Sequence, residues 1–247
     1  MISIKTPEEI QTIAEGGKIL AAALKELERM VKPGITTREL DKAAEAFILS
    51  KGAKPAFKGY DGFPFSLCVS VNENIVHGLP SEYALKDGDL LKLDLGVLFK
   101  GFNTDSAITV AVGSVSYEAK RLLHVTKKSL RLGIKKAKMG NTIGDIGNTI
   151  QRFVEDQGFG VVRDLCGHGI GKNLHEDPKV PNFGKRQGGE KLVEGMVICI
   201  EPMVTMGDYN LRKSDDNYGY ATKDNSLAAH FEHTIVITKS GSKILTE

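Results

Sequence analysis

The chain of 247 residues contains no tryptophan and only three cysteines, Cys68, Cys166 and Cys199. An odd number of cysteines without C-x-x-C spacing disfavours both a disulfide framework and a structural zinc site. No apolar run approaches the eighteen or so residues of a membrane span, and the N-terminus MISIKTPEEI lacks the basic start and apolar core of a signal peptide. The sequence therefore predicts a soluble cytoplasmic protein with no membrane partner.

Several catalytic motifs are also missing. No G-x-S-x-G segment occurs, which argues against a serine hydrolase. The segment HGIGK, from His168 to Lys172, lacks the glycine spacing and the Ser or Thr of a phosphate-binding loop. Cys166 lies two residues before His168, but closeness in sequence does not create the geometry of a thiol nucleophile and its base.

Neither sign of charge dominates, since the net charge is +2 with 26% charged and 41% hydrophobic residues. This composition is typical of a globular protein with a large core. Basic residues cluster only around Arg131, Lys135, Lys136 and Lys138, at helical spacing. We interpret the cluster as a solvated helix face, with contact to RNA or another acidic partner as the alternative. We expect no specific nucleic-acid partner.

Helix and strand signals occur twice in the same order. Capping residues and apolar periodicity predict helices over residues 7–31, 36–52, 116–137 and 142–157. Alternating apolar residues predict strands over residues 66–71, 196–204 and 231–238, and a β-hairpin over residues 89–110.

The second series repeats individual residues of the first. At one constant offset, residues in and around the second predicted helix recur in and around the fourth: Gly34, Thr36, Leu40, Phe47 and Gly52 match Gly140, Thr142, Ile146, Phe153 and Gly158. We therefore predict one domain over residues 1–247, made of pseudo-symmetric halves at about 1–115 and 116–247. The fold class would be α+β, with outer helices and a central antiparallel sheet.

The predicted hairpin contains two acids, Asp94 and Asp105, within apolar strands. The second half repeats them as Glu201 and Glu232, which we expect inside the strands VICIEPMV and HFEHTIVI. A two-fold axis would bring all four carboxylates together, and they cannot all stay ionised without cations. The pattern therefore predicts a site for divalent Mn, Co, Fe or Zn, in which a carboxylate can bridge two ions.

The histidines support this site. His168, in CGHGIG, matches Ser70 of the first half and is thus unique to one side, so we predict it as a fifth ligand. His77 and His175 form a symmetric pair, which suits proton transfer and stabilisation of an oxyanion next to a metal-bound substrate. Purely structural histidines are the alternative.

The acids and His168 stand in motifs that resemble the five metal ligands of type I methionine aminopeptidases in their bacterial form. The motifs are LKLDLG with Asp94, NTDSA with Asp105, GHGIG with His168, CIEP with Glu201 and FEHTI with Glu232. The match runs over nearly the whole chain and includes NENIVHG around His77 and LHEDP around His175. The resemblance implies the pita-bread fold, whose internal pseudo-symmetry agrees with the duplication.

The resemblance also implies residue roles. Asp94 would bind one of two divalent ions, Asp105 and Glu232 would bridge both, and His168 and Glu201 would complete the other. A hydroxide activated by the metals would release the N-terminal Met of nascent proteins whose second residue is small. His175 would stabilise the oxyanion, and His77 would contact the scissile amide. The substrates would be nascent N-termini; ribosome association is compatible with this role, and we expect a monomer.

An apolar pocket should hold the methionine side chain. The resemblance assigns its wall to Phe57, Tyr60, Phe63, Cys68, Leu174 and Tyr218. The sequence departs here from the usual family pattern, since Cys, Tyr, Phe and Trp are commoner at Phe57, Phe63, Leu174 and Tyr218, and Gln is usual at His230. The polar stretch 208–225 has no counterpart in the first half, and we expect it to place Tyr218 over the pocket as a lid.

Two other functions stay open. Xaa-Pro aminopeptidases and dipeptidases share the fold and the ligands, but they usually carry an extra amino-terminal domain for which we expect no room in this chain. A metal-free binding protein of the same fold would engage ribosomes or other partners without catalysis. Such relatives lose ligands, whereas this sequence keeps all five.

Overall fold

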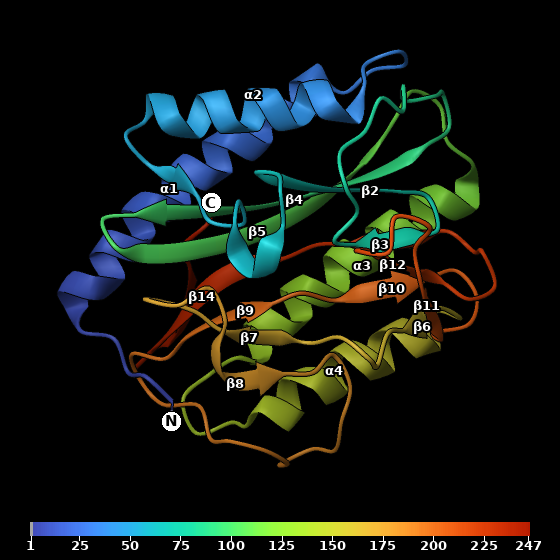
Figure 1. Cartoon of the computed structure of the whole chain (residues 1–247). Coiled ribbons are helices and arrows are strands. Elements are labelled where there is room, and N and C mark those ends of the chain that lie inside the picture. The colour runs from blue at the N-terminus through green and yellow to red at the C-terminus, as the bar shows by residue number, and fades with distance from the viewer. Residues whose placement is uncertain (1) are drawn as a thin grey trace.

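The computed structural model describes residues 2–247 as an α+β fold in which paired helices lie outside antiparallel sheets (Figure 1). Helices α1 (Pro7–Met30) and α2 (Thr37–Ser50) cover the sheet of the first half, and α3 (Tyr117–Lys136) and α4 (Ile143–Asp156) cover that of the second. Each predicted helix is present within a few residues of its expected bounds. None of the helices in the described part of the chain is long and apolar enough to cross a membrane.

The hairpin is the centre of the first half. Strand β4 (Leu90–Phe99) pairs along its whole length with β5 (Phe102–Ala111). Lys100 and Gly101 form the turn, with positive φ angles of 48° and 84°, as a two-residue hairpin turn requires. On its other edge β4 pairs with β2 (Leu67–Val71) and β1 (Lys54–Pro55).

The second half has a sheet of five strands and contributes to two smaller sheets. The order in the large sheet is β15 (Gly241–Ile244), β14 (His233–Thr238), β9 (Val197–Ile200), β7 (Gly167–Gly169) and β8 (Glu176–Val180). One small sheet contains β13 (Ala228–His230), β10 (Met203–Thr205) and β6 (Gly160–Val161). The other contains β11 (Leu211–Lys213), β12 (Tyr220–Thr222) and β3 (Asn74–Val76). Outside the sheets, Tyr60–Gly62 form the short helix η1.

The two acids of the second half do not lie inside strands, contrary to our expectation. Glu201 and Pro202 separate β9 from β10, and Glu232 lies between β13 and β14. Pro202 has no backbone N–H to donate to a sheet ladder, so the predicted strand divides there into two strands that enter different sheets. Asp94 and Asp105, by contrast, lie within β4 and β5 as predicted.

The duplication is visible in the backbone hydrogen bonds. The N–H of Gly34 donates to the carbonyl of Leu85, and the N–H of Gly140 donates to the carbonyl of Leu192 in the same way. Thr36 and Thr142 cap α2 and α4, each through a capping box with the acid three residues later. The two halves therefore repeat the same connection between helix and strand.

The halves join at β5 and β14 through side chains as well as backbone. Glu232 donates its N–H to the carbonyl of Ala107, and Ser106 Oγ donates to the Glu232 carbonyl. Thr234 Oγ1 donates to the Asp105 carbonyl and accepts from the Asp105 N–H. Because these bonds involve the two acids' own backbones, the junction of the halves also fixes Asp105 and Glu232 beside each other.

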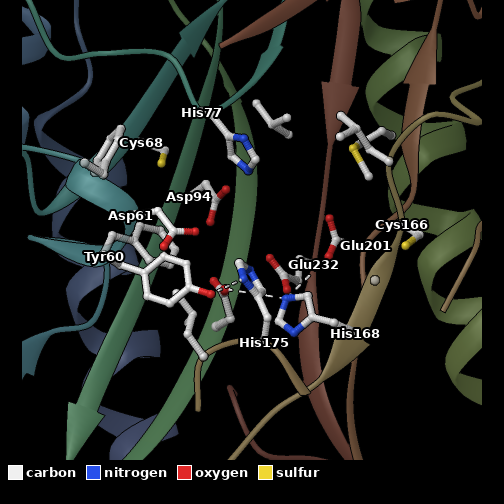
Figure 2. Close-up of a pocket in the computed structure, with 18 of the residues that line it drawn as sticks. Tyr60, Asp61, Cys68, His77, Asp94, Cys166, His168, His175, Glu201 and Glu232 are labelled. Atoms are coloured by element: carbon white, nitrogen blue, oxygen red, sulfur yellow. Dashed lines mark hydrogen bonds and ion pairs between the residues drawn. The ribbon is translucent and has the colours of Figure 1, made fainter. Parts of the chain in front are cut away.

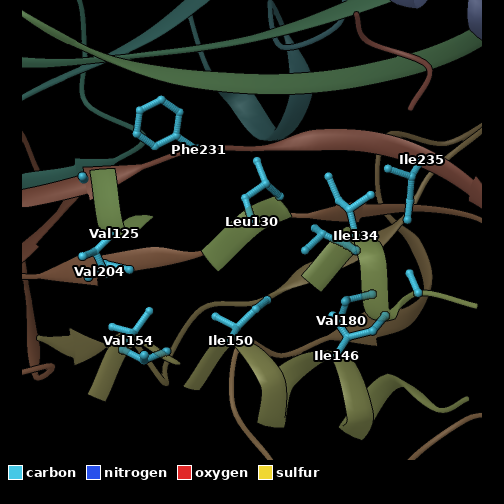
Figure 3. Close-up of a cluster of buried hydrophobic side chains, with 14 of the residues drawn as sticks. Val125, Leu130, Ile134, Ile146, Ile150, Val154, Val180, Val204, Phe231 and Ile235 are labelled. Carbon is cyan, nitrogen blue, oxygen red and sulfur yellow. The ribbon is translucent and has the colours of Figure 1, made fainter. Parts of the chain in front are cut away.

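A hydrophobic cluster packs α3 and α4 against the second-half sheet (Figure 3). It joins the inner faces of α3 and α4 to residues of the sheet region, and its buried members include Leu130, Ile134, Ile146, Ile150, Val180 and Ile235. A separate cluster packs α1 and α2 against β4. The acids at the centre thus lie between two apolar layers.

Lys92 is the largest fully buried side chain, with 1% of its surface exposed. Its Nζ donates to three carbonyl oxygens, at 2.6, 3.3 and 3.2 Å, those of Asn72, Leu90 and Ala228. Three acceptors match the three N–H bonds of an ammonium group. Since Ala228 belongs to the second half, Lys92 also ties β4 to β13.

Replacing Lys92 by Met keeps a long side chain but removes the three donors. Because three carbonyl oxygens lose a donor, two of them in buried bonds, we expect Lys92→Met to lower the free energy of unfolding by about 3 kcal/mol. Urea denaturation in the presence of a chelator measures this change. Lys18→Met, at an exposed position of α1, should change it by less than about 0.5 kcal/mol. Equal effects of the two substitutions would contradict the assigned bonds.

Candidate metal centre and peptide pocket

A cavity of about 730 Å³ opens between the two halves. Every residue that the sequence predicts for the site lines it: Phe57, Tyr60, Phe63, Cys68, His77, Asp94, Asp105, His168, Leu174, His175, Glu201, Tyr218 and Glu232. Figure 2 shows His77, His168, His175, Asp94, Glu201 and Glu232 around one central space. The structure thus brings all thirteen together, while the role of each stays a prediction.

The acids converge because of the strand register. Asp94 pairs with Ala107 across the hairpin, two residues beyond Asp105, so both acids lie on the same face of the sheet as diagonal neighbours. One carboxylate oxygen from each of Asp94, Asp105 and Glu232 lies within 4.8 Å of the others. All three residues are buried.

His168 faces the same cluster from β7. Its Nε2 lies 3.7 Å from Glu201 Oε1 and 4.0 Å from Asp105 Oδ2. Its Nδ1 lies 2.8 Å from the Gly169 carbonyl, which can only accept, so Nδ1 carries the proton. The lone pair of Nε2 therefore points to the carboxylates, which is the tautomer that a metal ligand needs.

Burial and the charges of neighbouring carboxylates raise the pKa values of the acids. Burial raises the pKa of Asp94 to about 7. Burial, followed by the charges of neighbouring acids, raises the pKa of Asp105, Glu201 and Glu232 well above their ordinary values. Burial lowers the pKa of His168 to about 4 and keeps the imidazole neutral. In the absence of a cation, these acids therefore resist full ionisation at neutral pH.

The cluster fits divalent metal ions. Asp94 Oδ1, Asp105 Oδ1 and Glu232 Oε1 are buried without a hydrogen-bond partner, although buried acceptors normally have one. Carboxylate oxygens with one neutral imidazole suit Mn, Fe, Co or Zn. The oxygens that lack protein partners are the atoms that such ions would bind.

Cys199 was not among the sequence-predicted ligands, yet its sulfur lies within 4.8 Å of ligand atoms of His168 and Glu232. Burial raises the pKa of the Cys199 thiol well above its usual value, and the sulfur lies 3.5 Å from Thr234 Oγ1. Because the thiolate is the form that binds metals, we assign Cys199 to the packing behind the site.

The two symmetric histidines, His77 and His175, both line the cavity but contact different neighbouring residues. His175 Nδ1 lies 2.9 Å from the Tyr60 hydroxyl, and its ring meets that of His168 edge to face at 4.5 Å. His77 has a positive φ of 60° and packs its ring against Tyr220. Burial lowers the pKa of His77 to about 4 and also lowers the pKa of His175. Both imidazoles are therefore neutral at pH 7.

The apolar wall of the cavity combines buried and exposed residues. Phe57, Phe63, Cys68 and Leu174 are buried, whereas Tyr218 is 41% exposed. The Tyr218 hydroxyl donates to the Gly62 carbonyl at 3.3 Å, and its ring lies 6.1 Å from that of Phe63. Tyr218 thus spans from the 208–225 segment to the first half of the chain.

Asp216 supports this arrangement, and sequence reasoning missed it. Its Oδ1 accepts from the N–H of Tyr218 at 2.9 Å, and its Oδ2 accepts from the N–H of Leu79 at 3.0 Å. The four donors around its carboxylate lower the pKa of Asp216 despite partial burial. Since Leu79 lies two residues after His77, one carboxylate connects the pocket wall to the loop of a candidate catalytic residue.

His230, at the position where the sequence departs from the usual Gln, lies beside Glu201 of the acid cluster. It is 1% exposed, and its Nε2 lies 3.8 Å from Glu201 Oε2. Burial lowers the pKa of His230 to about 3, so the ring is a neutral neighbour of Glu201. Neither ring nitrogen has a hydrogen-bond partner among the described residues.

The fold and the acid cluster define a metallopeptidase. A family model, metallopeptidase family M24, matches residues 11–239, and the chain belongs to this family. The structure superposes on the prolidase of Pyrococcus horikoshii with a TM-score of 0.81 at 27% identity, covering 99% of this chain and 63% of that one. The expected pita-bread fold is confirmed.

Within this family the chain is an aminopeptidase of the methionine aminopeptidase group. It is 50% identical to the methionine aminopeptidase of Clostridium perfringens over 246 residues, covering 100% of this chain and 99% of that protein. It superposes on the methionine aminopeptidase of Thermotoga maritima with a TM-score of 0.99 at 43% identity, covering 100% of both chains. The resemblance inferred from the motifs is confirmed.

Replacing Glu232 by Gln should stabilise the metal-free protein. The raised pKa of Glu232 means that its ionised form opposes folding: the fold is most stable below the unfolded pKa of about 4.3 and loses stability as the pH rises towards the folded value. We expect Glu232→Gln to raise the free energy of unfolding on the order of 2 kcal/mol in chelator at pH 8, and by less at pH 5.

The same substitution should remove the stabilisation that Mn²⁺ confers on the wild type, because one ligand is lost. Thermal unfolding with chelator and with Mn²⁺ at both pH values measures the two effects. Glu194→Gln, at an exposed position, is the control. A Glu232→Gln protein that is destabilised in chelator and still stabilised by Mn²⁺ would contradict the assignment.

Proposed function

We propose that the chain, as a single catalytic domain over residues 1–247, removes the N-terminal Met from nascent proteins and peptides with a small second residue. The observation that carries this proposal is the set of three buried carboxylate oxygens without partners, on Asp94, Asp105 and Glu232, in a cavity with an apolar wall. The acids of the cavity suit cations, and its apolar wall suits a thioether side chain.

We propose that two divalent ions bind here, Asp94 at one, His168 and Glu201 at the other, with Asp105 and Glu232 between them. Such ions supply Lewis acidity and a hydroxide nucleophile at neutral pH. The short separation of the Asp94, Asp105 and Glu232 oxygens and the Nε2 lone pair of His168 support this assignment. The donor set is compatible with Mn, Fe, Co or Zn.

The chain's own residues orient the peptide. Burial raises the pKa of Tyr60, which keeps its hydroxyl protonated and able to donate to Nδ1 of His175. Nε2 of His175 then carries the single N–H proton of the neutral ring and can donate to the oxyanion formed at the carbonyl of Met. We propose that His77, neutral and on the opposite side, contacts the scissile amide and assists its protonation.

The specificity for Met would come from Phe57, Phe63, Cys68 and Leu174, whose burial gives a fixed apolar wall, together with Tyr60 and Tyr218. The substrates would be nascent polypeptides, and we propose that the protein acts in the cytoplasm. Association with the ribosome is compatible with this function, and we propose that the protein is a monomer.

Release of Met from the peptide Met-Ala-Ser tests the function. We expect turnover by the Mn²⁺-loaded protein, loss of turnover with a chelator, its return with added Mn²⁺, and at least a thousandfold less turnover by Asp105→Ala. An Ala-Pro peptide should not be cleaved. Cleavage of Ala-Pro in place of Met-Ala-Ser would support an Xaa-Pro peptidase. If wild type and Asp105→Ala were equally inactive, a binding protein would be the better assignment.

Tyr218→Ala tests the lid. Removal of the ring opens the pocket wall next to Phe63, so we expect the ratio of kcat/KM for Met over Leu at the first position to fall about five- to tenfold. Tyr209→Ala is the matched control, because Tyr209 lies in the same segment but stacks on Arg163. Unchanged turnover and selectivity in Tyr218→Ala would show that this residue is not part of the pocket.

A further inference from the structure

Lys5 forms the most deeply buried Lys or Arg ion pair described within residues 2–247. Its Nζ binds Glu176 Oε2, and the two side chains are 3% and 11% exposed. In each of the other Lys or Arg pairs described, at least one side chain is 42% exposed or more. Exposed ion pairs contribute little to the free energy of unfolding. Lys5–Glu176 is therefore the ion pair whose loss we expect to disturb the structure most.

Both carboxylate oxygens of Glu176 have partners. Oε2 accepts from Lys5, and Oε1 accepts from the N–H of Asn173 at 3.0 Å. The carboxylate therefore links the end of the 171–176 loop to Asn173 within the loop and to Lys5 outside it. This loop contains Leu174 of the pocket wall and His175, the residue directly before Glu176.

The backbone around Lys5 is itself fixed. Its N–H donates to the Gly195 carbonyl at 2.9 Å, and Ile4 forms a bridge with Met196. The side chain crosses Gly171 so closely that a Cβ on this glycine would lie 2.5 Å from Lys5 Cε. The last glycine of the GHGIG motif thus leaves room for the ion pair, a requirement that the sequence pattern did not reveal.

The pair also breaks the symmetry of the duplication. The offset that relates His77 to His175 makes Gly78 the counterpart of Glu176. A Cβ on Gly78 would lie 2.3 Å from the Val69 carbonyl, so no acid fits there. Only the second histidine therefore has an ion pair next to it.

We propose that Lys5 is a positioning residue for peptide cleavage, which acts through Glu176 to hold His175 against Tyr60 and His168. The inference rests on the proposed function of His175. The ring of His175 is held at Nδ1 by Tyr60, and the ion pair fixes the backbone to which that ring is attached. A displacement of about 1 Å at a catalytic group can reduce turnover a hundredfold.

Lys5→Met tests the proposal in the Mn²⁺-loaded protein. For Met-Ala-Ser we expect kcat to fall about 10–100-fold, with KM and the Mn²⁺ dissociation constant, measured by calorimetry, within about threefold of wild type. Lys5→Arg should recover at least a third of kcat. Lys239→Met, which removes an exposed pair with Glu194, should leave kcat unchanged. If Lys5→Met does not fold, Lys5→Met with Glu176→Gln replaces it, since neither charge is then left unpaired.

A double-mutant cycle separates positioning from general stability. If Lys5 acts through His175, adding Lys5→Met to His175→Ala should reduce kcat by less than about twofold further. A full multiplication of the two losses, or an unchanged kcat in Lys5→Met, would overturn the proposal.

A spectroscopic measurement keeps this inference separate from the proposed function. In the metal-free protein, the ¹H and ¹⁵N ring signals of His175 should shift or broaden in Lys5→Met and return in Lys5→Arg. If the wild type releases no Met, the proposed function fails, while these signals still report whether Lys5 fixes His175. Unchanged signals in Lys5→Met would overturn the inference even in an active enzyme.

Discussion

The nearly complete burial of four neighbouring carboxylates is the constraint on which the rest of the structure depends. Burial and neighbouring charge raise the pKa of Asp105, Glu201 and Glu232 well above their usual values, so the site opposes folding when its acids are ionised. The surrounding structure holds the acids together in spite of this. Two apolar layers, the β5–β14 junction and the buried Lys92 all stabilise the centre. Binding of cations would convert the same repulsion into affinity.

The duplicated architecture explains how four acids reach one point. Each half contributes two, but the halves present them differently: Asp94 and Asp105 from continuous strands, Glu201 and Glu232 from breaks next to strands. At a break, the backbone is released from the ladder and can turn a longer side chain to the centre. The longer Glu side chains of the second half are consistent with this difference.

Features that depend on local pattern could be predicted from the sequence. Apolar periodicity and Thr or Ser caps locate all four helices, and the internal repeat alone is enough to group the four acids. The prediction that Glu201 and Glu232 lie inside strands is wrong, because the apolar run continues across Pro202 whereas the sheet ladder, which needs an N–H at each paired position, does not. Asp216 and the Lys5–Glu176 pair could not be found in this way, because their partners lie 137 and 171 residues away and no periodic pattern encodes such contacts.

These long-range contacts also explain how two equivalent histidines can take different roles. The loop after His77 is held by Asp216, an acid of the 208–225 segment that also binds the backbone of Tyr218. The loop of His175 is held by Lys5, from the segment before α1. Asp216 thus joins the loop of His77 to Tyr218 of the pocket wall, whereas the loop of His175 contains Leu174 of that wall and is joined to Lys5. The duplication provides two copies of a histidine loop, and residues outside the repeat, Asp216 and Lys5, hold the two copies through different contacts.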